Sequence, residues 1–437
     1  MIEQYQTHNL FRTNIKTFEE HDPHLSALKT FAFIHPMDWW RGIDFNEPGI
    51  FILTGGRQIG KSTSTKLLIK ESLTNGMFPN ENIFYLPCDQ IDSHQELGQI
   101  IRAFLQTINT GKHFLLIIDE VTYVTEWDRA IKAIADEGSF RNGLCIITGS
   151  DSIILKDAIS RFPGRRGRAA KTDFHIAPLN FKEYIELVDK SLIHSDENNS
   201  LFEYFNKYLR CGGHLRAIND LHGSGKILPA TYTVFEQWIR GDFQKRERSV
   251  PYLKGTLKSL IETVGSQVTY SSLTNRIGEL SKPTLIDYFN LLERLDVIFD
   301  LQAFDQNKHI GFPRKARKFH FWDPFILDTI KLWLERELEL STKSDMESVK
   351  IESIVAAHFK SHMPTFYFKG KGEIDVVTYR NKKATYIEVK WGKQIRSSDL
   401  EELKKRDNGI ILTKTPGSGI IEGIKTHFLP RFLIENF

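Results

Sequence analysis

Cysteine is scarce in this sequence of 437 residues, and so is any excess of charge. The three cysteines, Cys88, Cys145 and Cys211, are odd in number and far apart. This argues against a disulfide framework or a Cys-x-x-Cys metal site, and a reducing, cytoplasmic location is expected. The formal net charge is only +3, so a nucleic-acid partner would have to meet a local basic patch.

Long apolar runs are also missing. No run approaches the ~20 residues that a membrane-spanning helix needs. The first residues, MIEQYQTHNLFRTNIKTFEE, are polar and mixed in charge, unlike a signal peptide, so we expect no membrane partner. Hydrophobic residues make up 41% and charged residues 26% of the chain, which is typical of globular proteins with sizeable cores. The length favours about two to four domains.

The stretch GGRQIGKST carries the clearest motif, G-x-x-x-x-G-K-[ST]. Residues 49–54 predict a strand before it and residues 64–73 a helix after it. Glycines let successive N–H groups face one anion, and the helix N-terminus adds positive potential. We expect the loop to bind ATP, with Lys61 at the β- and γ-phosphates and Ser62 on Mg²⁺. The residues assigned to nucleotide binding here are Gly55, Gly56, Arg57, Gln58, Ile59, Gly60, Lys61, Ser62 and Thr63.

Later apolar runs end in further candidates for this site. The run FLLIIDE ends in Asp119, which can hold Mg²⁺ through water, and in Glu120, which can polarise the attacking water. The run LCIITGS ends with Thr148 and Ser150, which would lie beside the γ-phosphate. Small polar residues that merely end a strand are the alternative for this second pair.

A basic loop, GRRGR, follows with Arg165, Arg166 and Arg168. Arginine can stabilise charge on a transferring phosphoryl group, so these residues are candidates for contact with the nucleotide. A solvated basic loop explains them equally well. If the arginines act on the nucleotide of another copy, the protein must form a homo-oligomer.

The alternation of apolar runs and helical segments from residue 49 to about 178 predicts a doubly wound α/β sheet. Helical periodicity follows, and three helices before a two-stranded hairpin have the layout of a winged helix. The final segment is again α/β. The predicted division is 1–48 N-terminal lead-in, 49–178 P-loop ATPase core, 179–250 helical lid, 251–330 winged-helix module and 331–437 connector with a terminal α/β domain.

Three acids and a lysine stand out in the terminal domain. Glu352 lies on an expected helix, and Asp375 lies on a strand that a tight turn joins to the strand of Glu388 and Lys390. Side chains alternate along a strand, so Glu388 and Lys390 share a face, and the hairpin would bring Asp375 beside them. Paired carboxylates bind Mg²⁺, or Mn²⁺, and activate water. We expect Glu352, Asp375 and Glu388 to be metal ligands and Asp375, Glu388 and Lys390 to be catalytic; ordinary exposed charges on a hairpin are the alternative.

These motifs resemble known families. GGRQIGKST, LLIIDE, ITGSDS and the basic loop together resemble AAA+ ATPases of the archaeal-ATPase group, which is related to STAND signalling ATPases. The segment CGGHLR stands where that group has Gly-Gly-x-Pro; the proline is absent here, and Arg216 is the candidate lid arginine for nucleotide. Asp375 with Glu388-Val389-Lys390, and Glu352 as the helix acid, resembles the PD-(D/E)xK nuclease core, although Ile374 replaces the usual proline.

The resemblance implies an ATP- and Mg²⁺-dependent switch or motor coupled to a metal-dependent nuclease that acts on nucleic acid, with DNA favoured. Defence against foreign DNA is an analogy. One alternative is a nucleotide-gated signalling scaffold whose terminal domain only binds a partner. Another is a DNA-binding regulator that uses the winged helix, where the basic stretch 314–318 would meet phosphates but Asp287 and Glu293 are poor groups to face DNA.

Overall fold

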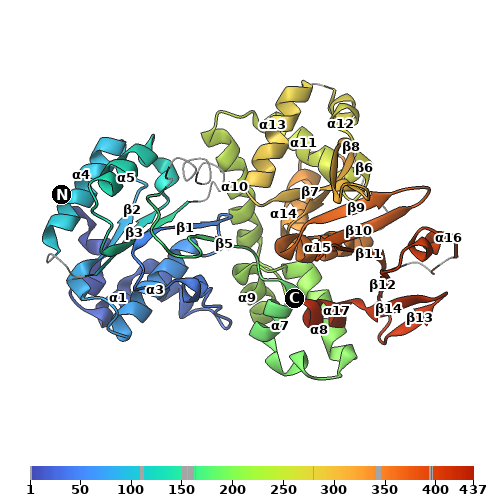
Figure 1. Ribbon diagram of the computed structural model, residues 1–437, viewed down its shortest axis with the longest axis horizontal. Coiled ribbons are helices and arrows are strands. Elements are labelled where there is room, and N and C mark those ends of the chain that lie inside the picture. Colours follow the sequence, from blue (N-terminus) through green and yellow to red (C-terminus); the bar gives the residue numbers. More distant parts are fainter. Residues whose placement is uncertain are drawn as a thin grey trace. The chain divides into compact units, whose positions relative to one another are not determined.

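The computed structural model describes residues 2–108, 113–149, 155, 162, 164–278, 280–340, 346–392, 395 and 397–437. The chain divides into two compact units, Met1–Ala177 and Pro178–Phe437 (Figure 1). Ser150, one of the predicted site residues, lies outside the described residues. None of the helices in the described part is both long enough and apolar enough to cross a bilayer.

A five-stranded parallel sheet forms the centre of the first unit. In the order of the sheet, its strands are β2 (Ile83–Pro87), β3 (Phe114–Asp119), β4 (Gly143–Thr148), β1 (Gly49–Gly55) and β5 (Asp173–Ile176). Every residue of β1, β3 and β4 is buried, as expected for strands that are covered on both faces. The predicted α/β fold with a parallel sheet is confirmed. Because the strands are parallel, the loop after β1 and the acids after β3 lie at the same edge of the sheet.

Helices cover both faces of this sheet. Figure 1 shows α4 (His94–Thr107) and α5 (Trp127–Asp136) on one side and α3 (Lys61–Thr74) on the other. Isoleucine and phenylalanine side chains of α4 and α5 pack with those of β2, β3 and β4 in one core cluster. The first 48 residues are mostly helical. The short helices of this unit are η1 (Ile2–His8), η2 (Leu10–Arg12), α1 (Ile15–His21), α2 (Pro23–Leu28), η3 (Trp39–Gly42), η4 (Asn80–Asn82) and η5 (Val121–Tyr123).

The second unit begins with helices and continues into a mixed sheet. Its first ten helices are α7 (Phe181–Val188), η6 (Lys190–Ile193), α8 (Asn198–Cys211), α9 (Leu215–Ser224), α10 (Pro229–Lys245), α11 (Val250–Thr263), α12 (Tyr270–Ile277), α13 (Lys282–Arg294), α14 (Pro324–Glu335) and α15 (Met346–His362). Among the described residues, three more helices follow near the C-terminus: α16 (Ser397–Leu400), η7 (Leu403–Lys405) and α17 (Leu429–Asn436).

Nine strands form one sheet in this unit, in the order β13-β14-β12-β11-β10-β9-β7-β8-β6. Ala303 of β7 pairs with Tyr367 of β9, so the hairpin predicted for the winged-helix segment continues the sheet of the terminal segment. The strands are β6 (Gln267–Val268), β7 (Ile298–Asp305), β8 (Ile310–Phe321), β9 (Thr365–Lys369), β10 (Glu373–Arg380), β11 (Lys383–Lys390), β12 (Gly409–Thr413), β13 (Gly419–Ile421) and β14 (Ile424–Phe428). This continuity lets a residue of β8 reach the terminal acids.

Candidate functional sites

The loop between β1 and α3 curls around the side chain of Lys61. Its ammonium donates to the carbonyl oxygens of Gly55, at 2.9 Å, and Gly56, at 3.0 Å, and the side chain is only 4% exposed. Gly55 and Gly60 have φ angles of 150° and 101°, which glycine tolerates and other residues rarely adopt. A Cβ atom at Gly55 would lie 2.5 Å from the carbonyl oxygen of Ile176, so only glycine fits there.

The helix that leaves this loop starts without a side-chain cap. Gly60 is its N-cap residue and has no side chain to accept a hydrogen bond from the first turn. The N–H groups of that turn, which includes Lys61, Ser62 and Thr63, have no acceptor within the helix and carry the positive end of its dipole. Of the other loop residues, Ile59 is buried, Arg57 is half-buried and Gln58 is exposed with φ of 60°. The start of α3 is therefore suited to an anion.

The two acids that end β3 lie at the same edge. Asp119 is 5% exposed, and both of its carboxylate oxygens accept short hydrogen bonds, from Tyr85 of β2 and from Thr148 of β4. Glu120 has a left-handed backbone, with φ of 52° and ψ of 45°, and its N–H donates to Thr148 Oγ1 at 3.0 Å. Its carboxylate lies 3.6 Å from the Lys61 ammonium. The structure thus brings the predicted residues Lys61, Asp119, Glu120 and Thr148 together.

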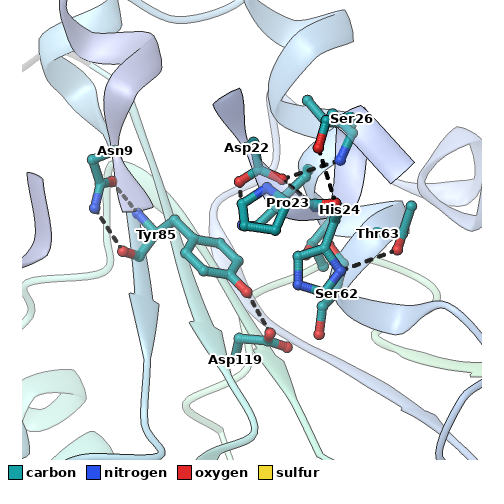
Figure 2. Close-up of polar contacts among 12 residues, drawn as sticks. Asn9, Asp22, Pro23, His24, Ser26, Ser62, Thr63, Tyr85 and Asp119 are labelled. Carbon is teal, nitrogen blue, oxygen red and sulfur yellow. Dashed lines mark hydrogen bonds and ion pairs between the residues drawn. The ribbon is translucent and has the colours of Figure 1, made fainter. Parts of the chain in front are cut away.

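Tyr85 was not predicted and is central to this arrangement. Figure 2 shows its ring directed at Asp119, while Asn9 of the N-terminal segment binds the Tyr85 backbone through both its amide oxygen and its amide nitrogen. Burial and the charge of Asp119 raise the pKa of Tyr85 well above its usual value, so its hydroxyl remains a donor. The same view places His24 beside Ser62 and Thr63, and its Nδ1 atom lies 3.3 Å from Thr63 Oγ1.

Arg165 and Arg166 of the basic loop pair with acids of the first unit. Arg165 pairs with Asp136, and Arg166 forms two hydrogen bonds with Asp173, at 2.8 and 2.9 Å. The backbone carbonyl of Arg166 packs against Gly49, at the start of β1, whereas the phosphate-type loop follows the end of that strand. Within one chain, Arg165 and Arg166 therefore do not approach the loop. Arg168 is exposed in the same segment, and Arg216 is exposed on α9 in the second unit.

The terminal acids gather around an unexpected lysine. Lys318 of β8 is 1% exposed, and its ammonium lies 2.9 Å from Glu352 Oε1, 2.5 Å from Glu373 Oε1 and 3.6 Å from Asp375 Oδ1. Glu352 comes from α15 and the other two acids from β10. The prediction that the basic stretch 314–318 meets phosphates is wrong for Lys318, because this residue is buried among carboxylates.

The predicted neighbours Asp375, Glu388 and Lys390 do meet in the hairpin of β10 and β11. The Lys390 ammonium lies 2.8 Å from Glu388 Oε1, and Asp375 Oδ2 accepts from the N–H of Val389 at 2.9 Å. Among the described residues, no group of three or more His, Cys, Asp or Glu side chains is placed to hold a metal ion. Glu352 and Asp375 face the Lys318 ammonium and Glu388 contacts the Lys390 ammonium, so in this arrangement the predicted metal ligands Glu352, Asp375 and Glu388 serve two lysines and do not fit one metal ion.

Burial makes these carboxylates difficult to ionise. Burial, together with the nearby charge of Asp375, raises the pKa of Glu388 to about 8. Burial also raises the pKa of Glu352 to about 7, although the charge of Lys318 opposes the shift. Burial alone would lower the pKa of Lys318, but the charges of Glu352, Asp375 and Glu373 outweigh burial and raise it. The cluster therefore contains more acidic groups than its lysines neutralise.

In the rest of the basic stretch 314–318, which is predicted to bind nucleic acid, two cationic side chains are exposed. Arg317 pairs with Asp300 at 2.9 Å, which leaves Arg314 and Lys315 exposed in the basic stretch. On α13, Asp287 pairs with Arg248 at 2.8 Å, and burial raises the pKa of Glu293 to about 7. Neither acid of α13 is therefore presented as an unpaired exposed charge.

Comparison with known protein families gives three matches. Residues 47–185 match AAA_14, described as an AAA domain. Residues 202–338 match a domain of unknown function, DUF8612, and residues 346–423 match another, DUF4143. No curated protein matches the chain. The AAA match confirms the predicted AAA-type P-loop ATPase domain in the N-terminal part of the chain.

Solved structures resemble the chain only weakly. The Walker-type ATPase PABY2304 of Pyrococcus abyssi is 13% identical, with a TM-score of 0.43 over 64% of this chain and 91% of its own. The ORC2 protein of Aeropyrum pernix, in ADPNP–ADP complexes, is 11% identical, with a TM-score of 0.39 over 73% and 94%. The Aeropyrum pernix ORC1 protein in complex with DNA is 11% identical, with a TM-score of 0.34 over 76% and 92%. Similarity at this level assigns no function.

Proposed function

We propose that this chain is an ATP-hydrolysing molecular switch of the AAA type. The observation that carries the proposal is the meeting of Lys61 and Glu120 at 3.6 Å, beside the buried Asp119, at the carboxyl edge of the parallel sheet. Phosphoryl transfer to water needs an anion-binding loop, an acid for the metal and an acid for the water at one place. The match of residues 47–185 to an AAA domain supports the same activity.

The residues at this edge suit a complex of ATP with Mg²⁺. The first N–H groups of α3 and the Lys61 ammonium would hold the phosphates, and the Ser62 hydroxyl and Asp119 would hold Mg²⁺. Bound Mg²⁺ supplies stabilisation of negative charge on the phosphoryl oxygens. Glu120 accepts a hydrogen bond from the attacking water and orients it. Thr148 contacts both acids and positions them relative to each other.

The substitution Glu120→Gln tests the proposed hydrolysis. An amide cannot accept the proton of the water, so we expect ATP turnover to fall by about 100-fold or more. Nucleotide affinity should stay within roughly threefold of wild type, because the loop and Lys61 are unchanged. Phosphate release measures turnover, and titration with a fluorescent ATP analogue measures affinity.

Glu126→Gln is the matched control for this experiment. Glu126 also has a left-handed backbone, with φ of 55°, but its carboxylate pairs with Arg129 at 2.9 Å. This control should hydrolyse ATP at the wild-type rate. Wild-type turnover in Glu120→Gln would reject Glu120 as the residue that activates water, and no turnover in the wild type would reject the ATPase proposal itself.

We propose further that the output of the switch is the terminal domain, which acts on nucleic acid, with DNA favoured, as a metal-dependent nuclease. The gathering of Asp375, Glu388 and Lys390 on neighbouring strands, with Glu352 on α15 beside them, supports this proposal. The arginines of the basic loop would contribute to a nucleotide only in a homo-oligomer, where they can meet the loop of another copy. Biological roles such as defence stay an analogy.

Plasmid cleavage in Mn²⁺ and ATP tests the nuclease. We expect wild-type protein to nick plasmid and Asp375→Asn to reduce the product to background, because the substitution removes a carboxylate charge from the cluster without changing its shape. Asp407→Asn is the control, since Asp407 is exposed in the turn before β12. Equal cleavage by the wild type and Asp375→Asn would show that this cluster does not cut.

One observation favours a second candidate, a nucleotide-gated scaffold whose terminal domain binds a partner without cutting. Lys318 neutralises the carboxylates that a metal would need, which is the arrangement expected of a structural ion-pair network. The scaffold predicts slow ATP turnover, assembly that depends on nucleotide and no cleavage in any metal. Light scattering with and without a non-hydrolysable ATP analogue measures that assembly.

A further inference from the structure

Lys318 is held by acids from two different elements. The Glu352 carboxylate of α15 and the Glu373 carboxylate of β10 lie 2.9 and 2.5 Å from its ammonium, and Asp375 lies 3.6 Å away. The lysine itself comes from β8, in the hairpin that joins the terminal sheet through the pair Ala303 and Tyr367. Its side chain is 1% exposed. The buried ammonium of Lys318, on the hairpin of β7 and β8, therefore contacts carboxylates that come from α15 and β10.

The cluster also contains a buried carboxylate oxygen that no hydrogen bond satisfies, within the described residues. Glu388 is 6% exposed, and its Oε2 atom has no hydrogen-bond partner within the described part of the chain. Its other carboxylate oxygen contacts Lys390 at 2.8 Å. Four carboxylates, Glu352, Glu373, Asp375 and Glu388, therefore share two ammonium groups, Lys318 and Lys390. A buried carboxyl oxygen without a hydrogen-bond partner is costly, and either a donor or a cation would satisfy it.

We propose that the Lys318 ammonium is a built-in cation that occupies the divalent-metal position of this acidic cluster, so that removing it creates a Mn²⁺ or Mg²⁺ site. This inference rests on the proposed function only in taking the same acids as metal ligands. A monovalent ammonium donates hydrogen bonds to carboxylates at 2.5–2.9 Å and neutralises one charge. Carboxylate oxygens coordinate a divalent ion at shorter distances, and the ion neutralises two charges. We therefore expect it to bind at this position once the ammonium is removed.

Mn²⁺ binding to Lys318→Met in the full chain tests the inference. Methionine is similar to lysine in length and uncharged, and it leaves the carboxylates in place. We expect the variant to bind one Mn²⁺ per chain at least about tenfold more tightly than the wild type, because its buried carboxylates need a counter-charge. The wild type should bind weakly at this cluster. Isothermal titration calorimetry measures affinity, with nucleotide omitted so that the first unit contributes little, and thermal unfolding measures stabilisation by Mn²⁺.

Two variants control the position of the ion. Lys315→Met changes an exposed lysine on the same strand and should bind Mn²⁺ as the wild type does. Lys318→Met combined with Asp375→Asn should lose the gained binding, because a ligand of the new site is removed. If Lys318→Met alone does not fold, the pair Lys318→Met and Glu373→Gln removes one negative charge together with the ammonium, and the same gain over Glu373→Gln is expected.

Each outcome decides the inference. It is overturned if the folded Lys318 variants bind Mn²⁺ no more tightly than their lysine-containing parents, or if the gain survives Asp375→Asn. It is also overturned if the wild type already binds Mn²⁺ tightly at this cluster, a result that would leave the nuclease proposal intact. If Lys318→Met gains the metal but the wild type does not cut plasmid, the inference stands and the nuclease proposal fails. The two failures are therefore distinguishable.

Discussion

Replacing Lys61 by alanine is expected to lower ATP turnover by at least about 100-fold, because one preorganised positive charge on the phosphates is lost. The lysine side chain is 4% exposed and is directed by two backbone carbonyl oxygens, those of Gly55 and Gly56, so its ammonium is fixed before any nucleotide arrives. Its ammonium also lies 3.6 Å from the carboxylate of Glu120. The variant should also bind nucleotide more weakly, unlike Glu120→Gln.

The control for Lys61→Ala should be a lysine of the same helix that is far from Asp119 and Glu120. Lys70 of α3 is 42% exposed and pairs with Glu19 at 3.3 Å, so Lys70→Ala is the matched control. Phosphate release and fluorescent-nucleotide titration are measured for both variants, with circular dichroism to confirm that each is folded. If Lys61→Ala turns over ATP as fast as Lys70→Ala, the loop is not the phosphate site and the ATPase proposal is wrong.

The sheet of the first unit could be predicted because its strands are local patterns. Each is a short apolar run bounded by polar residues, and a strand that is buried on both faces leaves that signature whatever its partners are. The phosphate-type loop was equally visible, since its glycines are required by backbone angles within a few residues. Asp119 and Glu120 followed from their position at the end of such a run.

The side chains that contact Asp119 come from strands that are distant from it in the sequence. Tyr85 reaches Asp119 only because β2 lies beside β3, and no spacing within the sequence reveals this register. The same limit explains the arginine loop. Arg165, Arg166 and Arg168 are candidates for the nucleotide site by their chemistry, with a solvated basic loop as the equal alternative. In the structure β5 pairs with β1, so that Arg166 lies near Gly49 at the start of the strand.

The terminal site shows the limit most clearly. Alternation along β11 and the short turn before it were enough to bring Asp375, Glu388 and Lys390 together. The sequence predicts that Lys318 meets phosphates because it ends a run of basic residues, FPRKARK, and nothing local distinguishes it from Lys315. In the hairpin, Arg317 pairs with Gln302 and Phe312 with Ala303, so the intervening residues bulge and Lys318 turns inward. The sequence does not reveal β13 and β14, because β13 has only three residues, none of them buried, and β14 has polar residues, Lys425, Thr426 and His427, at its centre.

A buried ion pair between Asp22 and Lys66 connects the N-terminal segment to α3, and no sequence pattern indicates this pair. Both side chains are almost completely inaccessible, 1% and 3% exposed, and their charged groups are in contact. Asp22 precedes α2, and Lys66 lies in the helix that follows the phosphate-type loop. The Lys66 ammonium also lies 4.7 Å from the centre of the Tyr85 ring. The pair therefore ties the first residues of the chain to the helix that carries Lys61.

Asp22→Asn is expected to destabilise this part of the first unit by about 3 kcal/mol, because it leaves the Lys66 ammonium buried without a counter-charge. The asparagine keeps the N-cap of α2, where Asp22 Oδ1 accepts from the N–H groups of His24 and Leu25 at 2.9 and 3.2 Å. Hydrogen exchange of peptides that cover α3 measures the free energy of local opening without requiring two-state unfolding of the whole chain.

Glu19→Gln provides the control, because it breaks the exposed pair with Lys70 and should change the opening free energy by less than about 0.5 kcal/mol. Combining Asp22→Asn with Lys66→Met removes the stranded charge and should restore most of the lost protection. A loss below about 1 kcal/mol in Asp22→Asn would mean that water or another group reaches Lys66. Because Lys66 and Lys61 share one helix, Asp22→Asn should also weaken nucleotide binding, whereas Glu19→Gln should not.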